Sequence, residues 1–254
     1  MTKVAKLAKI ALVTGGSRGI GAATAQQLAA AGYAVCINYL HNHEAAQQVV
    51  QEIEAQGGTA IALQADVANE TEVVRLFNEI DARLGKLDAL VNNAGILMQQ
   101  CRLEDLTAER INRLLSTNVT SYFLCCREAV KRMSTRHGGK GGAIVNVSSA
   151  AARLGSAFEY IDYAATKGAI DTLTKGLSVE VAAEGIRVNS VRPGLIHTTM
   201  HADGGEANRV ERLKTNVPML RGGAPEEVAS AISFLLSDAA SYITGSFVDV
   251  SGGR

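Results

Sequence analysis

The segment Tyr163-Ala164-Ala165-Thr166-Lys167 places a phenol and an ammonium group four residues apart. On a helix, residues at i and i+4 share a face, so the two side chains would be neighbours. Tyrosine titrates at about 10 in water, and a nearby cation stabilises the phenolate and lowers that pKa. The pair is therefore a candidate general acid/base. Because this spacing is frequent by chance, it does not establish an enzyme by itself.

Two other polar residues could belong to the same site. Ser149 comes directly after a predicted strand and could donate a hydrogen bond to a substrate oxygen, with Ser148 as its competitor for that role. Asn118 lies inside a long predicted helix, although asparagine is a poor helix former. It could carry a water-mediated proton relay, or it could mark a bend in the helix.

A glycine-rich segment, Thr14-Gly15-Gly16-Ser17-Arg18-Gly19-Ile20-Gly21, joins the first predicted strand to the first predicted helix. The spacing of its glycines is GxxxGxG instead of GxGxxG. Gly15 would permit a sharp turn, Gly19 would let the backbone approach a pyrophosphate, and Gly21 would let the helix pack on the strand. Exposed N–H groups at the helix start then bind phosphates. An ordinary turn is the alternative, and the position of the loop favours a dinucleotide site.

The end of the second strand decides which dinucleotide is expected. NAD-binding loops are followed, about twenty residues later, by an acid that binds the ribose hydroxyl. Here the strand ends at Asn38-Tyr39, and the nearest acid is Glu44. Arg18 could pair with a 2′-phosphate, its alternative being an ordinary surface charge. The sequence therefore predicts NADP(H) as the preferred cofactor, with NAD(H) as the second choice.

Two more loops follow predicted strands at the same edge of the sheet. Asp66-Val67 could flank an adenine. Asn92-Asn93-Ala94-Gly95 could form a floor beside the cofactor, since Asn and Gly tolerate unusual backbone angles.

Short apolar runs alternate with helical patterns along the whole chain. Strands are predicted at 10–13, 35–39, 60–65, 87–91, 143–147, 186–191 and 247–250, and helices at 19–31, 44–56, 70–84, 107–136, 162–183 and 225–236. Apolar strands joined by helices indicate a parallel sheet covered on both faces. We therefore predict an α/β fold, a doubly wound sheet of about seven strands, forming a single domain over residues 1–254. A polar segment, residues 197–216, contains His197 and His201 and could be a lid over the substrate.

Composition excludes several other classes of protein. Lys+Arg and Asp+Glu are both 25, so the net charge is +0, which argues against nucleic acid as a partner. The basic residues Lys131, Arg132, Arg136, His137 and Lys140 fit a solvated helix end. Without an apolar stretch of about 18 residues, no membrane span is expected. Cys36, Cys101, Cys125 and Cys126 form no metal-ligand pattern, so no metal site and a cytoplasmic location are predicted.

Taken together, the motifs TGGSRGIG (14–21), NNAG (92–95), Ser149, YAATK (163–167) and RPG (192–194) resemble the short-chain dehydrogenase/reductase family. The resemblance covers essentially the whole chain. It implies that Tyr163 exchanges a proton with a carbonyl or alcohol oxygen while Lys167 lowers its pKa and binds the nicotinamide ribose. Ser149, and not Ser148, would orient the substrate, because Gly155 follows it by six residues as in family members. Asn118 would hold a relay water.

The resemblance also implies the remaining cofactor contacts and an assembly. Pro193, Gly194, Ile196 and Thr198 would bind the nicotinamide amide, and Asn38 and Tyr39 would line the adenosine ribose. Family members usually form homotetramers through the C-terminal region. The expected partner is a small carbonyl or alcohol substrate, and an idle redox-sensing protein is the alternative.

The chain departs from the family pattern in two places. The segment 156–162 is one residue longer than in many relatives, so substrate specificity does not carry over. Glu184 stands where relatives acting on acyl carrier protein tend to have a basic residue, and an acid would repel an anionic carrier. Sugars, 3-oxoacyl thioesters and small ketones remain open as substrate classes.

Overall fold

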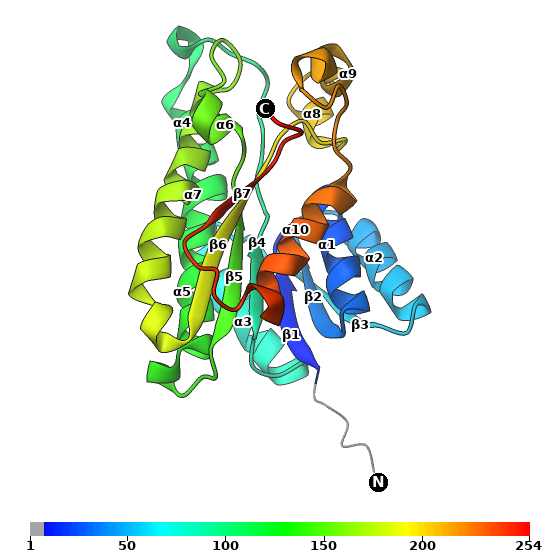
Figure 1. The fold of residues 1–254 in the computed structure, drawn as a ribbon, viewed down its shortest axis with the longest axis vertical. Helices are drawn as coiled ribbons and strands as arrows, with labels where there is room; N and C mark the ends of the chain where they lie inside the picture. Colours follow the sequence, from blue (N-terminus) through cyan, green and yellow to red (C-terminus); the bar gives the residue numbers. More distant parts are fainter. Residues whose placement is uncertain (1–7) are drawn as a thin grey trace.

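A single seven-stranded sheet runs through the molecule (Figure 1), whose computed structural model describes residues 8–254. The strands are β1 Lys9–Val13, β2 Tyr33–Tyr39, β3 Thr59–Gln64, β4 Ala89–Asn92, β5 Gly142–Val147, β6 Ile186–Pro193 and β7 Phe247–Val250. Their order is β3-β2-β1-β4-β5-β6-β7, and every adjacent pair is parallel. This is the predicted doubly wound sheet, with β3 and β7 at its two edges.

Ten α-helices connect the strands within residues 8–254. They are α1 Gly19–Ala30, α2 His43–Ala55, α3 Glu70–Arg83, α4 Ala108–Leu115, α5 Ser121–Met133, α6 Ala151–Leu154, α7 Ile161–Glu180, α8 Met200–Asp203, α9 Arg209–Leu213 and α10 Pro225–Leu236. None of the helices in this part of the chain is long and apolar enough to cross a membrane.

The helices cover the sheet as two layers (Figure 1). Side chains of α1, α2 and α10 pack on one face, and side chains of α3 and α5 pack on the other. Strands with neighbours on both faces must be apolar throughout, and β2 is indeed buried at every position. The periodic apolar residues of α3 that the sequence indicated, Val73, Leu76, Phe77 and Ile80, are all buried.

The long helix predicted over residues 107–136 is divided. A π-helical turn, Ser116–Thr120, separates α4 from α5 and contains Asn118. Such turns are rare and often occur at functional sites. Asn118 thus lies at an irregularity of the helix, which is compatible with either of the two roles considered for it.

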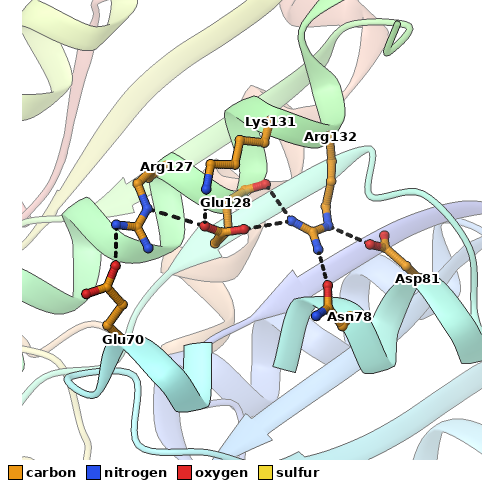
Figure 2. Close-up of polar contacts among 7 residues, drawn as sticks. All are labelled: Glu70, Asn78, Asp81, Arg127, Glu128, Lys131 and Arg132. Atoms are coloured by element: carbon orange, nitrogen blue, oxygen red, sulfur yellow. Dashed lines mark hydrogen bonds and ion pairs between the residues drawn. The ribbon is translucent and has the colours of Figure 1, made fainter. Parts of the chain in front are cut away.

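A network of charges joins α3 to α5 (Figure 2). Glu128 is buried and accepts hydrogen bonds from Lys131 and Arg132. Arg132 also donates to Asp81 and Asn78 of α3. Two members of the predicted basic cluster are thus neutralised by carboxylates of the same chain, which argues further against a nucleic-acid surface.

The polar segment 197–216 contains more order than a plain loop. It includes the two short helices α8 and α9, which lie beside the C-terminus of the chain in Figure 1. Arg209, at the start of α9, is buried and pairs with Glu159 and Glu206. Ion pairs therefore attach this lid segment to the loop that precedes α7.

Candidate active site

A cavity of about 150 Å³ lies beyond the carboxyl ends of β4, β5 and β6. Doubly wound sheets bind ligands at this edge. The residues around it include Ile20, Asn93, Gly95, Leu97, Ser148, Ser149, Leu154, Tyr160, Tyr163, Lys167, Pro193, Gly194, Leu195, Ile196, Thr198, Met200 and His201. The pair Tyr163 and Lys167 and the separately predicted Ser149 therefore meet at one cavity.

Burial dominates the ionisation of Tyr163. It raises the pKa of the phenol to about 12, although a hydrogen bond with Ser149 acts in the opposite direction. The sequence predicted a lowered pKa through Lys167, and in this structure that is wrong. Lys167 Nζ lies 5.6 Å from the ring centroid of Tyr163, and burial sets the direction of the pKa shift of the phenol. At neutral pH the phenol is protonated and able to donate.

Lys167 is almost completely buried, and its ammonium points at the end of β5. Its Nζ donates to the carbonyl oxygen of Val147 at 2.8 Å and to the Tyr122 hydroxyl at 3.3 Å. Burial lowers the pKa of Lys167 to about 7. The amine of Lys167 therefore loses its proton more readily than that of an exposed lysine.

Tyr122 is a site residue that sequence reasoning missed. Its hydroxyl also donates to Val147 O, at 2.9 Å, so it shares that acceptor with Lys167. Burial raises the pKa of Tyr122 well above its ordinary value. One signal was present in the sequence: Tyr122 follows Asn118 by four residues, which places both on one helix face.

The two serines after β5 point in different directions. Ser148 Oγ is buried and donates to the main-chain oxygen of Lys167 at 3.2 Å. Ser149 Oγ accepts from the N–H of Ala151 and makes the hydrogen bond with Tyr163. Of the two, only Ser149 has its hydroxyl beside the phenol.

The amide of Asn118 is fully engaged with neighbouring groups. Its Oδ1 accepts from Ile96 N at 2.8 Å, and its Nδ2 donates to Ile96 O and to Thr166 Oγ1. The side chain thus links the loop after β4 to α7. A water held by Asn118 would have to bind its main chain.

The glycine loop has the geometry that its composition predicted. Gly15 adopts a φ of +60°, where other residues are strained. A Cβ on Gly21 would lie 2.4 Å from Gly15 O and 2.6 Å from Asn93 Nδ2, so no larger residue fits. Asn93, predicted as part of a floor beside the cofactor, donates to Thr14 O and Gly15 O and thereby holds the loop.

The start of α1 offers main-chain donors to a ligand. Arg18 occupies the N-cap position and makes no side-chain cap to the helix. Ser17 and Gly19 are partly exposed there, and Ile20 faces the cavity. A Cβ on Gly19 would lie 3.3 Å from Thr198, so Thr198 lies directly over the loop. A helix start with free N–H groups is an anion site, and a pyrophosphate fits it.

Arg18 points toward the lid segment and away from the end of β2. Its guanidinium donates to Thr199 Oγ1 at 2.9 Å and to Asp203 Oδ2 at 2.7 Å. The position predicted for a 2′-phosphate ligand is therefore occupied by a carboxylate of α8. A phosphate that used Arg18 would have to displace Asp203.

Several predicted cofactor contacts are engaged inside the protein. Asn38 is buried, its Oδ1 accepting from Gly15 N and its Nδ2 donating to Ala65 O. Tyr39 is buried with its hydroxyl 2.6 Å from His43 Nδ1. Asn92 is buried and donates to Asn146 and Cys126. These side chains shape the sheet edge from beneath, so a ligand would meet their main chains.

The remaining predicted contacts lie nearer to the surface of the site. Asp66 Oδ1 accepts from Ala68 N, and Val67 is buried beside it. Ala94 follows Asn93, its N–H donating to Thr14 Oγ1. A Cβ on Gly95 would lie 3.7 Å from Lys167 Nζ, so glycine keeps the approach to the lysine open.

The loop after β6 forms another wall of the cavity. Pro193, Gly194, Ile196 and Thr198 all line it, as the family resemblance implied. A Cβ on Gly194 would lie 2.8 Å from Ser251 Cα, so the loop packs closely on the C-terminal strand. His201 also lines the cavity, and its Nε2 lies 2.9 Å from Ile196 O. In residues 8–254, no group of three His, Cys, Asp or Glu side chains is placed to hold a metal ion.

Known proteins similar to this chain have been found by sequence. A family model described as "Enoyl-(Acyl carrier protein) reductase" matches residues 15–254. The uncharacterized oxidoreductase YgfF of Escherichia coli (strain K12) is 67% identical over 245 residues, covering 96% of this chain and 99% of that protein. The 3-oxoacyl-[acyl-carrier-protein] reductase FabG of Staphylococcus aureus (strain Mu50) is 39% identical, covering 98% of each.

Solved structures agree with these relatives. A short-chain dehydrogenase/reductase from Serratia marcescens BCRC 10948 superposes with a TM-score of 0.89 at 33% identity, over 97% of this chain and 98% of that one. A short-chain dehydrogenase from Burkholderia cenocepacia J2315, solved in complex with NADP, gives 0.88 at 39% identity over the same shares. The predicted family is confirmed: the chain belongs to the short-chain dehydrogenase/reductase family of oxidoreductases.

Proposed function

We propose that the protein is an NADP(H)-dependent oxidoreductase that interconverts a small carbonyl compound and its alcohol, with Tyr163 as general acid/base. The observation that carries this proposal is the convergence of Tyr163, Ser149 and Lys167 on one cavity beside the glycine loop. Two structural relatives were solved in complex with NADP or NADPH, which supports the choice of cofactor.

The residues present fit a nicotinamide dinucleotide. The uncapped start of α1 supplies N–H donors for a pyrophosphate, and Gly19 and Gly95 leave room for a ligand to approach. Pro193 and Thr198 line the cavity where the nicotinamide would lie. When bound, the cofactor supplies or accepts the hydride.

The chain's own residues provide the proton and the orientation. The buried phenol of Tyr163 is protonated at neutral pH and can donate to a carbonyl oxygen as negative charge develops there. The Ser149 hydroxyl beside it can donate a second hydrogen bond to the same oxygen. Lys167, with a pKa of about 7, can return a proton toward Tyr163 between turnovers.

The lining of the cavity favours a small, largely apolar substrate. Leu97, Leu154, Leu195 and Met200 contribute apolar surface, which suits a ketone or an acyl group better than a sugar. Glu184 accepts a hydrogen bond from Ser134 and lies 3.9 Å from Arg136, so the charge of this arginine is offset. We therefore place neutral ketones ahead of substrates carried on an acidic protein, although several 3-oxoacyl-[acyl-carrier-protein] reductases are relatives.

An idle redox-sensing protein is the second candidate. It would need the glycine loop but none of Tyr163, Ser149 and Lys167. Since all three meet at the cavity, the catalytic function is the one we propose.

Assembly and location follow as expectations of the same proposal. Phe123 of α5 and Val179 of α7 are exposed apolar side chains, and such surfaces are often covered in oligomers. We propose a homotetramer, which light scattering during gel filtration would test. The thiols of Cys36, Cys125 and Cys126 are buried and unpaired, which suits a reducing compartment such as the cytoplasm.

Paired fluorescence titrations with NADPH and NADH test the cofactor, and turnover of ethyl acetoacetate, acetoacetyl-CoA and glucose tests the substrate class. Tighter binding of NADPH and reduction of the ketoester are expected. In Tyr163→Phe, kcat should fall by roughly 10²–10⁴ while the NADPH affinity stays the same. Undiminished activity in this variant would contradict the mechanism. If neither cofactor binds, both the enzymatic and the redox-sensing hypotheses are wrong.

A further inference from the structure

Arg110 of α4 lies behind the catalytic helix in a buried ion pair. Its Nε donates to Asp162 Oδ2 at 2.6 Å, and the two side chains are 13% and 4% exposed. Arg110 does not line the cavity and carries none of the family motifs. Its partner Asp162 is nevertheless the residue that directly precedes Tyr163.

Asp162 uses both carboxylate oxygens. Oδ2 accepts from Arg110, and Oδ1 accepts from the main-chain N–H of Tyr163 at 2.9 Å. Asp162 lies in the first turn of α7, where a carboxylate suits the helix dipole. A buried carboxylate needs a paired, hydrogen-bonding partner, and Arg110 is that partner for the group that anchors the Tyr163 backbone.

The same guanidinium reaches the opposite wall of the cavity. Its Nη1 donates to the main-chain oxygen of Gln99 at 2.7 Å. Gln99 belongs to the loop after β4, whose Gly95 and Leu97 line the cavity. One side chain therefore joins the helix that carries the phenol to the loop that faces it.

The position of Arg110 is itself well defined. Its main-chain N–H donates to Thr107 Oγ1, the N-cap of α4. Its third nitrogen, Nη2, is buried without a hydrogen-bond partner in residues 8–254. An unsatisfied buried donor lowers stability, so stability alone does not explain this arrangement.

We propose that Arg110 is a positioning residue that sets the distance between the Tyr163 phenol and the loop wall at Leu97. This inference rests on the proposed role of Tyr163. A planar guanidinium can donate to two acceptors with fixed geometry. A lysine ammonium can replace its charge but not this planar arrangement of donors. The expected defect is in the chemical step, since no cofactor contact passes through Arg110.

The test compares Arg110→Gln and Arg110→Lys with wild type in NADPH-dependent reduction of ethyl acetoacetate. We expect kcat to fall about 10- to 100-fold in Arg110→Gln, with the NADPH dissociation constant unchanged within about twofold and with partial recovery in Arg110→Lys. Arg75→Gln, which removes a surface ion pair on α3, is the matched control and should leave kcat unchanged. A kcat in Arg110→Gln equal to that of the control would overturn the proposal.

Hydrogen–deuterium exchange supplies a readout that needs no turnover. Arg110→Gln should speed exchange in residues 96–101 and 160–166 and leave the rest of the protein unchanged. If exchange rises everywhere, Arg110 supports the whole fold and the positioning role is wrong. If Tyr163→Phe keeps full activity, the proposed function fails instead, and unchanged exchange in the two segments would then overturn the positioning role independently. Where the glutamine variant does not fold, Asp162→Asn provides the same comparison with a near-isosteric side chain.

Discussion

Arg18 in the glycine loop donates to Asp203 on α8 across 2.7 Å. The glycine loop is thereby joined to the polar segment 197–216. Thr199 accepts a second hydrogen bond from the same guanidinium, at 2.9 Å. A 2′-phosphate that recruits Arg18 must compete with both oxygens.

Asp203→Asn should therefore tighten NADPH binding. The two side chains of the pair are 60% and 45% exposed, so solvent screens the interaction and it contributes at most about 1 kcal/mol. That corresponds to a decrease in the NADPH dissociation constant of up to about fivefold, with the NADH value unchanged. Fluorescence titration measures both. Glu211→Gln removes an exposed carboxylate that pairs with Lys214 and controls for net charge; equal tightening of NADH would contradict the competition.

Ser149 and Ser148 should behave differently when each is replaced by alanine. Ser149→Ala removes the hydroxyl beside Tyr163, and kcat for ketoester reduction should fall about 10²-fold. Ser148→Ala removes a buried hydrogen bond to Lys167 O, which should cost about 1 kcal/mol of unfolding free energy and affect the rate less. Steady-state kinetics and urea unfolding distinguish the two, and the reverse order of effects on kcat would reassign the serine role.

Lys167 should make stability depend on pH in a defined window. Its pKa is lowered by burial from 10.5 to about 7, so above pH 7 the unfolded chain holds more protons than the folded one. The free energy of unfolding therefore rises with pH between about 7 and 10.5. Lys167→Met abolishes this titration, so its stability relative to wild type should be greatest at or below pH 7 and decline toward pH 10.5.

Urea unfolding of both proteins across that pH range measures the difference. Lys175→Met is the control, because Lys175 is on the same helix but exposed. If the difference in free energy of unfolding between wild type and Lys167→Met does not depend on pH, the pKa of Lys167 is not lowered in the folded protein.

Glu128 should be the most costly carboxylate to remove from the network in Figure 2. Its side chain is 5% exposed and pairs with Arg127, Lys131 and Arg132. Burial raises its pKa, but hydrogen bonds from Lys131 and Arg132 outweigh burial and hold the pKa below 4.5. Its stabilisation is thus complete at neutral pH and is lost only as pH falls through that lowered value.

Glu128→Ala should lower the free energy of unfolding by about 3 kcal/mol at pH 7, because the buried Arg132 loses a counter-charge. Glu70→Ala, which removes an exposed partner of Arg127, should change it little. Urea unfolding measures both variants. Equal losses would show that burial does not set the strength of these pairs.

The sheet, the glycine loop and the meeting of Tyr163, Lys167 and Ser149 could all be predicted from the amino-acid sequence. Each rests on a local pattern: an apolar strand, a glycine at a turn, or a four-residue spacing on a helix. Parallel strands with right-handed crossovers then bring the loop ends to one edge. Helix bounds such as Pro225–Leu236 were predicted correctly because proline and periodicity mark them locally.

The directions in which side chains point at that edge could not be predicted from the sequence. Asn92 lies under the site, Ser148 faces the α7 backbone, Arg18 contacts Asp203, and Tyr122 shares an acceptor with Lys167. Each depends on a partner distant in sequence. The pKa of Tyr163 is likewise raised by burial, which a hydrogen bond with Ser149 only partly opposes. The four-residue spacing of Tyr163 and Lys167 reveals only a nearby charge. Burial, the largest influence on the pKa of Tyr163, exists only once the chain has folded.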